Sequence, residues 1–192
     1  MSDYYDANPI RVPKIPIGLI GFFGSEPVQV ANQLGALTGL NTADVAHLMI
    51  HKEGASIAKI LLGLGPEHYR KVEVECLDMA LKSDPPGIVS LPHDMLSDDT
   101  TRRDVLERTA LVYLHQDYEP MVRKVRSMVE ERPGVFFPWV DPEHVCAGNL
   151  ERLLEEHRAG YDEAMLHVDV TGKRPLEIAR TIIEHFELWR ED

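Results

Sequence analysis

The sequence has little cysteine, little basic charge and no long apolar run. Its two cysteines, Cys76 and Cys146, match no metal-ligand spacing, so we expect free thiols in a reducing cytoplasm. No run approaches the roughly 20 apolar residues of a membrane span, and the acidic start does not resemble a secretory signal. The nine histidines are spread along the chain with one HxxxH spacing, at His47 and His51, and we expect no metal site. These absences predict a cytoplasmic protein without membrane association.

The charge and the length of the chain restrict its partners and its number of domains. The formal net charge is −12, whereas a nucleic-acid backbone needs basic surface, so we expect no nucleic-acid partner. The 192 residues suffice for one domain with a substantial core and are too few for two ordinary ones. We expect a polar leader at 1–14 and a single domain at 15–192.

Short apolar segments alternate with amphipathic segments along the whole domain. The apolar runs predict buried strands at 15–22, 88–91, 110–114 and 166–170. The amphipathic segments predict helices at 28–37, 44–54, 56–64, 67–82, 118–131, 149–165 and 174–189, and one that follows residues 98–101 and runs to about 108. Strands separated by helices imply a parallel sheet with helices on both faces, a three-layer α/β sandwich. Residues 132–148 contain prolines and aromatics without periodicity and are expected to form a lid-like loop.

The first strand leads directly into a glycine-containing turn. The turn reads Gly21-Phe-Phe-Gly24-Ser25, and a helix follows it. In such a setting the glycines let backbone N–H groups wrap a phosphate at the N-terminus of the helix. The arrangement is typical of a phosphate-binding P-loop.

The order of segments around this loop resembles the shikimate kinase family. The resemblance rests on residues 21–25, on Glu-Gly-Ala-Ser-Ile-Ala-Lys-Ile at 53–60 and on Gly-Pro-Glu-His-Tyr-Arg-Lys-Val-Glu at 65–73. It continues through Val168-Asp-Val170 and a final helix, so it covers nearly the whole chain from Ile15 onward. The resemblance implies a five-stranded parallel sheet flanked by helices, and a kinase that uses ATP and Mg²⁺.

The phosphate loop departs from the family where the chemistry is done. A Walker A pattern starting at Gly21 would have a glycine at Glu26, a lysine at Pro27 and a hydroxyl residue at Val28. Glu26 places a carboxylate where a polyanion should bind. Pro27 removes both a backbone donor and the cation, and Val28 cannot ligate magnesium. We therefore expect no ATP and no Mg²⁺ at this loop.

Two further family elements are altered. The family's Asp-x-Asp pair becomes Asp44-Val-Ala, which keeps the metal-associated acid and loses the acid that would bind the hydroxyls of shikimate. The family's three glycines after the third strand become Pro92, His93 and Asp94. Three side chains then occupy space where the family brings bare backbone against its substrate, so we expect a reshaped acceptor site.

Three arginines match positions that bind ligands in the family. Arg70 and Arg158 correspond to the two arginines that hold the shikimate carboxylate, and Arg132 corresponds to the lid arginine that reaches the phosphates. Guanidinium groups bind carboxylates through two parallel hydrogen bonds, so Arg70 and Arg158 could form an anion site.

Each of these residues also has a simpler interpretation. Asp44 fits the cap of the helix that follows it, and Arg70 fits a salt bridge with Glu73 or Glu67. Arg158 has a surface role as its alternative. A His-Asp pair at 93–94 is more typical of turn chemistry than of catalysis.

Three functions remain open. The leading hypothesis is a pseudoenzyme of this fold that senses a small carboxylate ligand or binds a partner protein. The alternative is a divergent kinase that phosphorylates shikimate or a related hydroxy acid with ATP, using Asp44 and Arg132. A third hypothesis is a purely structural role, in which the lid aromatics Phe136, Phe137 and Trp139 and the acidic surface dock a partner protein. Glu26, His93 and Phe136 would then fill the former cleft.

Overall fold

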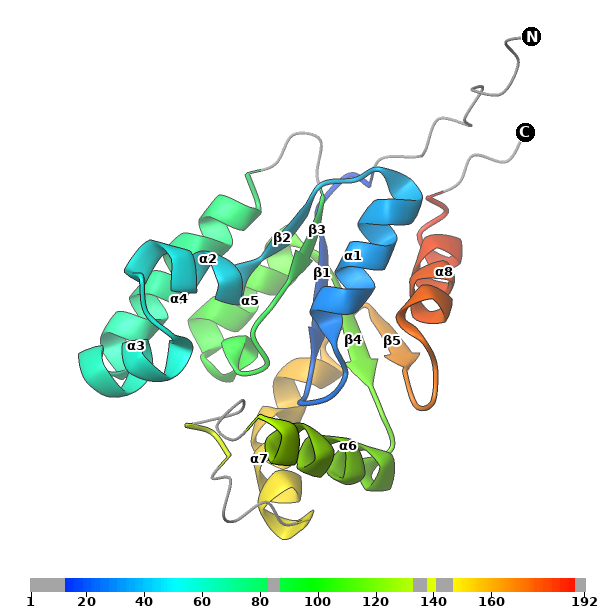
Figure 1. The fold of residues 1–192 in the computed structure, drawn as a ribbon. Helices are drawn as coiled ribbons and strands as arrows, with labels where there is room; N and C mark the ends of the chain where they lie inside the picture. Colours follow the sequence, from blue (N-terminus) through cyan, green and yellow to red (C-terminus); the bar gives the residue numbers. More distant parts are fainter. Residues whose placement is uncertain (1–12, 83–86, 133–137, 141–146, 189–192) are drawn as a thin grey trace, which may run out of the picture.

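The chain folds around one five-stranded sheet whose strands all run parallel. A computed structural model describes residues 13–82, 87–132, 138–140 and 147–188 (Figure 1). The strand order is β2-β3-β1-β4-β5. The strands are β1 (Ile17–Gly21), β2 (Thr42–Asp44), β3 (Ile88–Ser90), β4 (Ala110–His115) and β5 (Leu166–Asp169). The five-stranded parallel sheet that the resemblance implied is confirmed.

The central strand β1 is buried along its whole length. Ile17 pairs with Ile88 of β3 on one side and with Ala110 of β4 on the other. Because β1 is covered on both faces, every residue of its sequence Ile-Gly-Leu-Ile-Gly is buried. The end of β1 therefore lies at the middle of the sheet's carboxyl edge, which is where open parallel sheets bind their ligands.

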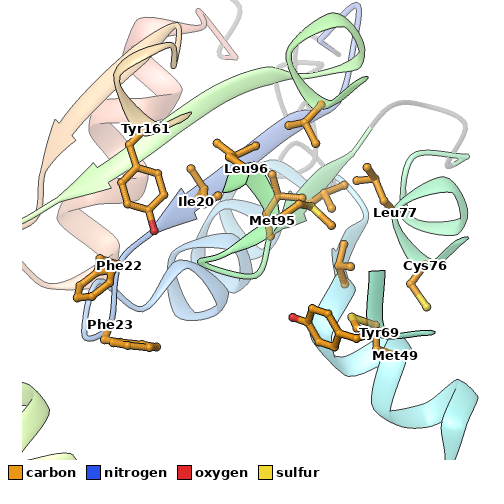
Figure 2. Packing of buried hydrophobic residues seen from close by; sticks show 14 of the residues in the cluster. Ile20, Phe22, Phe23, Met49, Tyr69, Cys76, Leu77, Met95, Leu96 and Tyr161 are labelled. Atoms are coloured by element: carbon orange, nitrogen blue, oxygen red, sulfur yellow. The ribbon is translucent and has the colours of Figure 1, made fainter. Parts of the chain in front are cut away.

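Helices cover the two faces of the sheet and give the molecule three layers (Figure 1). Helices α1 (Pro27–Thr38) and α8 (Pro175–His185) pack on one face, over a core that includes Leu19 and Val112. Helices α4 (Pro66–Ala80) and α5 (Asp99–Arg108) cover the other face, over a core that includes Ile20 and Leu111 (Figure 2). The alternation of Leu19 and Ile20 between the two cores follows from the two-residue period of a strand.

Four further helices complete the described part of the chain. Helices α2 (Val45–Glu53) and α3 (Ile57–Leu64) pack against α4 beyond the β2 edge of the sheet. Helices α6 (Tyr118–Glu131) and α7 (Ala147–Asp162) lie at the carboxyl ends of the strands and contact each other (Figure 1). The loop that leaves β1 therefore faces α6.

Most expected boundaries agree with the structure, and the differences have simple causes. Gly54, the last residue of the expected helix 44–54, ends α2 with φ 62°, and α4 begins at Pro66, one residue before the expected start. The strand Thr42–Asp44 was implied by the family resemblance alone, because three residues are too few to show a period. The helix expected at 149–165 begins earlier, at Ala147, and ends at Asp162.

Two of the expected segments lie largely outside the described residues. Residues 1–12 of the expected leader and residues 133–137 and 141–146 of the expected lid belong to this group, as do Phe136, Phe137 and Cys146. Within the described ranges, no helix combines the length and the apolar character that a membrane crossing requires. In the same ranges, no three His, Cys, Asp or Glu side chains gather closely enough to hold a metal ion.

Candidate functional site

The loop between β1 and α1 is a tight turn. The Ser25 hydroxyl donates to the Phe22 carbonyl oxygen at 2.7 Å, and the Ser25 N–H donates to the same oxygen at 3.1 Å. A Cβ atom at Gly21 would lie 2.7 Å from the Leu114 carbonyl oxygen, and Gly24 has φ 82°. Glycine is therefore favoured at both positions of this turn.

Glu26 has a left-handed backbone conformation, which is uncommon for a residue other than glycine. Its φ is 57° and its ψ is 51°, a left-handed conformation that costs a residue with a Cβ about 1 kcal/mol. Its carboxylate accepts a hydrogen bond from the Lys124 ammonium at 2.8 Å. Pro27, the first residue of α1, has no N–H, and Val28 is half-buried. The loop thus presents an internal ion pair at the start of α1.

Aromatic side chains occupy the space beside the loop. Phe22 and Phe23 are buried at the end of β1 (Figure 2). The ring of His93 lies 4.3 Å from the ring of Phe23 and 4.8 Å from the ring of Trp139, measured between centroids. The His157 ring lies 5.5 Å from the His93 ring. We call Phe22, Phe23, His93, Trp139 and His157 the aromatic cluster.

The two histidines of the aromatic cluster are neutral. Burial lowers the pKa of His93 to about 4, although Asp94 acts in the opposite direction. Burial also lowers the pKa of His157. Nε2 of His93 and both ring nitrogens of His157 have no hydrogen-bond partner within the described residues. His93 therefore packs against aromatic rings and does not contact Asp94 as a base would contact its orienting carboxylate.

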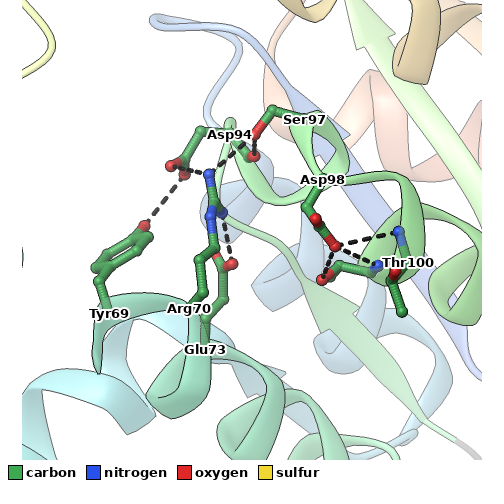
Figure 3. Close-up of polar contacts among 8 residues, drawn as sticks. Tyr69, Arg70, Glu73, Asp94, Ser97, Asp98 and Thr100 are labelled. Atoms are coloured by element: carbon green, nitrogen blue, oxygen red, sulfur yellow. Dashed lines mark hydrogen bonds and ion pairs between the residues drawn. The ribbon is translucent and has the colours of Figure 1, made fainter. Parts of the chain in front are cut away.

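Arg70 is held by side chains of its own chain (Figure 3). Its Nη1 donates to Glu73 Oε2 at 2.6 Å, and its Nη2 donates to Asp94 Oδ2 at 3.2 Å and to Ser97 Oγ at 2.9 Å. Burial lowers the pKa of Arg70, but Glu73 and Asp94 outweigh it and raise the pKa overall. Tyr69 donates its hydroxyl to the other oxygen of Asp94 at 3.1 Å. We call Tyr69, Arg70, Glu73, Asp94 and Ser97 the Arg70 network.

Glu73 carries the most perturbed carboxyl group of this network. Its side chain is fully buried, and Oε1 has no hydrogen-bond partner in the described part of the chain. Burial and the nearby Asp94 raise the pKa of Glu73 to about 7, against the effect of Arg70. Two carboxyl groups share one guanidinium, so the positive charge of Arg70 already has partners of opposite charge within the network.

Hydrogen bonds from two helices hold the loop that carries His93 and Asp94. The Tyr161 hydroxyl of α7 donates to the His93 carbonyl oxygen at 2.6 Å, and the Tyr69 hydroxyl of α4 holds Asp94. The Met95 N–H donates to the Pro92 carbonyl oxygen at 3.2 Å, which starts the short 3₁₀ helix Met95–Ser97. The loop Pro92–Asp94 is thus fixed by contacts with α4 and α7 and by its own backbone.

The other candidate residues have separate surroundings. Asp44 caps α2, where its carboxylate accepts from the Ala46 N–H at 3.0 Å. Arg132 is exposed at the end of α6. Arg158 is exposed on α7, donates to Glu155 at 2.6 Å and shares no contact with the Arg70 network. The anion site expected from Arg70 and Arg158 together is therefore not assembled.

Arg158 instead lines a separate cavity at the carboxyl ends of β4 and β5. The cavity has a volume of about 370 Å³. Its lining consists of Leu154 and of polar and aromatic side chains, namely Tyr113, His115, Gln116, Asp117, Tyr118, Arg158, Asp162 and His167. Gln116 also donates to the Phe23 carbonyl oxygen at 2.8 Å and so connects this wall to the phosphate loop.

Sequence reasoning missed two residues that shape the site. His157 faces the aromatic cluster where the family pattern led us to expect Arg158. The helical spacing was the available signal, because Leu150, His157 and Tyr161 are buried on one face of α7 and Arg158 is not. Lys124 lies 98 residues from Glu26 in sequence, so no local pattern could have indicated their ion pair.

Comparisons with known proteins agree with this architecture. The family model described as shikimate kinase matches residues 28–187. A shikimate kinase of Thermus thermophilus is 26% identical over 181 residues, which cover 93% of this chain and 92% of that protein. The shikimate kinase of Caulobacter vibrioides NA1000 is 29% identical over 174 residues, which cover 91% of this chain and 82% of that protein.

Solved structures show the same fold. Shikimate kinase from Bacteroides thetaiotaomicron has a TM-score of 0.78 at 14% identity, covering 91% of this chain and 99% of that chain. Shikimate kinase from Acinetobacter baumannii in complex with shikimate has a TM-score of 0.75 at 20% identity, covering 92% and 94%. At these identities the structures show the fold, while the family model matches most of the sequence itself. This chain belongs to the shikimate kinase family.

Proposed function

We propose that this chain is a shikimate kinase family member that does not transfer phosphate from ATP and acts by binding instead. The observation that carries the proposal is the ion pair between Glu26 and Lys124 at the start of α1. A phosphate group at this loop would meet the carboxylate of Glu26, and like charges at contact repel strongly where water is excluded. The ammonium of Lys124 already has its counter-charge.

The next two residues of the loop also do not fit ATP and Mg²⁺. Pro27 has no N–H to donate to a phosphate oxygen and no cation to reach the β- and γ-phosphates. Val28 offers methyl groups where the Walker A pattern has a magnesium-binding hydroxyl. Asp44, the retained acid, accepts a hydrogen bond from the backbone of α2. These features support loss of phosphotransfer independently of Glu26.

Nucleotide binding is the direct test. Calorimetric titration of the protein with ATP and Mg²⁺ is expected to give no saturable heat up to about 1 mM, a limit that corresponds to a binding free energy of about −4 kcal/mol. The matched variant carries Glu26→Gly, Pro27→Lys and Val28→Thr, which together complete the Walker A pattern on the existing backbone turn. We expect this triple variant to bind ATP more tightly than the wild type. Micromolar binding by the wild type would reject the proposal.

For the binding role, the proposal names a small carboxylate at the cavity beside Arg158. Arg158 is exposed, lies outside the Arg70 network and lines a cavity of about 370 Å³ with polar side chains. A guanidinium at the edge of such a cavity binds a carboxylate through two parallel hydrogen bonds. Its present partner Glu155 is itself exposed, so a ligand can displace it at little cost.

An NMR titration with citrate as the probe tests this part. We expect saturable shifts of the Arg158 Nε–H resonance and of the neighbouring Tyr113 and His167, and loss of these shifts in Arg158→Ala. Arg152→Ala is the matched control, because Arg152 is exposed on the same helix and pairs with Glu156 at 2.6 Å. Equal effects of the two variants would mean that citrate binds no defined site.

A further inference from the structure

The Arg70 guanidinium already has a buried carboxylate in contact with it. A carboxylate oxygen of Asp94 lies 3.2 Å from Nη2 of Arg70, and the other oxygen accepts from the Tyr69 hydroxyl at 3.1 Å (Figure 3). Asp94 is 4% exposed, so its carboxylate lies inside the protein. A carboxylate held between a guanidinium and a hydroxyl has the surroundings of a bound carboxylate ligand.

The origin of this carboxylate is the altered loop after β3. By the family resemblance, the position of Asp94 corresponds to a glycine, which has no side chain to offer. The replacement therefore brings an acid to an arginine that, by resemblance, binds the carboxylate of a substrate. Retention of Arg70 in a chain with a disabled phosphate loop then has a physical reason, because removing it would leave Asp94 and Glu73 buried without a counter-charge.

The contact is also held in place. Ser97 donates both its N–H, at 3.1 Å, and its hydroxyl, at 2.6 Å, to the Asp94 carbonyl oxygen. Tyr161 fixes the preceding residue, His93, through its carbonyl oxygen. A group fixed next to its partner acts at a high effective concentration, so a carboxylate from solution competes poorly with it.

We propose that Asp94 is a built-in carboxylate ligand of Arg70, an autoinhibitory contact that keeps external carboxylates out of the acceptor half of the site. The inference deepens the proposed function and rests on it in treating this half as a remnant of a substrate site. The inference is separate from the loss of phosphotransfer, because it concerns the contacts of Arg70 and involves no nucleotide.

Chemical rescue by formate tests the inference. Asp94→Gly restores the glycine that the family resemblance implies and leaves a space of carboxylate size beside Arg70. We expect the variant to melt at a lower temperature than the wild type. Formate should then raise its Tm by about 3 °C or more in a saturable manner, beyond sodium chloride of equal ionic strength. The wild type should show no shift specific to formate, because Asp94 already occupies the position.

Two further variants make the test specific. Asp98→Ala is the matched control, because Asp98 is a nearby acid that caps α5 through Thr100 and Thr101 but makes no hydrogen bond to Arg70. Its lower Tm should not respond to formate. Asp94→Gly combined with Arg70→Met should lose the formate response altogether.

Each result of the formate titrations either supports the inference or overturns it. If Asp94→Gly does not fold, Asp94→Ser, which keeps a hydroxyl acceptor, carries the same titration. Absence of a formate-specific shift in the folded Asp94 variant, or an equal shift without Arg70, overturns the inference. Because no nucleotide is present, these results are independent of the ATP titration, so a failure here does not count against the loss of phosphotransfer.

Discussion

The phosphate loop and the Pro92–Asp94 loop follow β1 and β3, two strands that pair side by side in the sheet. The first loop contains a tight turn, and its Glu26 forms an ion pair with Lys124 of α6. In the second loop, Asp94 forms an ion pair with Arg70 of α4. In both loops an acidic side chain therefore pairs with a cation of a neighbouring helix.

The comparison of the two loops shows why a residue that matches a family position does not by itself indicate a ligand site. Arg70 matches a family position, yet its hydrogen bonds go to Glu73, Asp94 and Ser97 of the same chain. An arginine that balances two buried carboxylates is kept because the fold depends on it, whether or not any ligand binds. The variants below are ordered from the largest expected effect to the smallest.

The largest effect is expected for Arg70→Met. The substitution leaves Glu73 and Asp94 buried beside each other without a cation, so the free energy of unfolding should fall by about 3 kcal/mol. Unfolding in urea at pH 7 measures this change. Arg158→Met is the control, since an exposed ion pair contributes little, and it should stay within about 0.5 kcal/mol of the wild type. Similar losses in both variants would remove the distinction between the two arginines.

A pH-dependent effect is expected for His93→Phe. The pKa of His93 is about 4 in the folded protein and its ordinary value is 6.5, so the unfolded chain binds more protons between these pH values. The wild type therefore loses stability through His93 as the pH falls from 6.5 towards 4. Relative to the phenylalanine variant, the wild type should lose about 2 kcal/mol between pH 7 and pH 5.

The pH dependence of stability that comes from Glu73 has the opposite sign to that from His93, so the measurement must distinguish the two. Its pKa is raised to about 7, so the folded protein binds more protons than the unfolded chain between about pH 4.5 and pH 7. Its contribution to stability falls as the pH rises through that window. Comparing the two proteins at each pH in urea unfolding cancels this contribution. A difference that does not change with pH would contradict the neutral, packed state of His93.

The smallest effect is expected for Glu26→Gly. Glycine relieves the left-handed backbone at φ 57°, and loss of the partly exposed pair with Lys124 offsets this gain. The free energy of unfolding should change by less than about 1 kcal/mol. Gly54→Ala is the control for the reverse change, from glycine to a residue with a Cβ. Gly54 has φ 62°, and a Cβ added there would meet no atom within 4 Å. Only backbone strain should therefore destabilise that variant, by about 1 kcal/mol.

Sequence reasoning predicted the fold for identifiable reasons. Buried strands, proline at the helix starts Pro66 and Pro175, and glycine at Gly54 are local signals. The expected loss of phosphate binding at Glu26, Pro27 and Val28 also rests on a local signal, residue type at fixed spacing, and it stays a prediction.

The contacts of the Arg70 network and the inward face of α7 could not be predicted from such local signals. Arg70 and Asp94 are 24 residues apart and meet because α4 packs beside the loop after β3. Either Glu67 or Glu73 fitted an ion pair with Arg70 from helical spacing, and the structure places Glu73 there. Which face of α7 turns inward decides between His157 and Arg158, and that depends on packing against the aromatic cluster.

Phosphotransfer itself is the most direct measurement of the central claim. Equimolar protein, ATP, Mg²⁺ and shikimate can be followed by ³¹P NMR over many hours, beside a sample without protein. The account predicts no new phosphate-ester resonance and no loss of ATP beyond the protein-free sample. A new resonance that grows with the wild type and is absent with Asp44→Ala would contradict it and identify the chain as an active kinase.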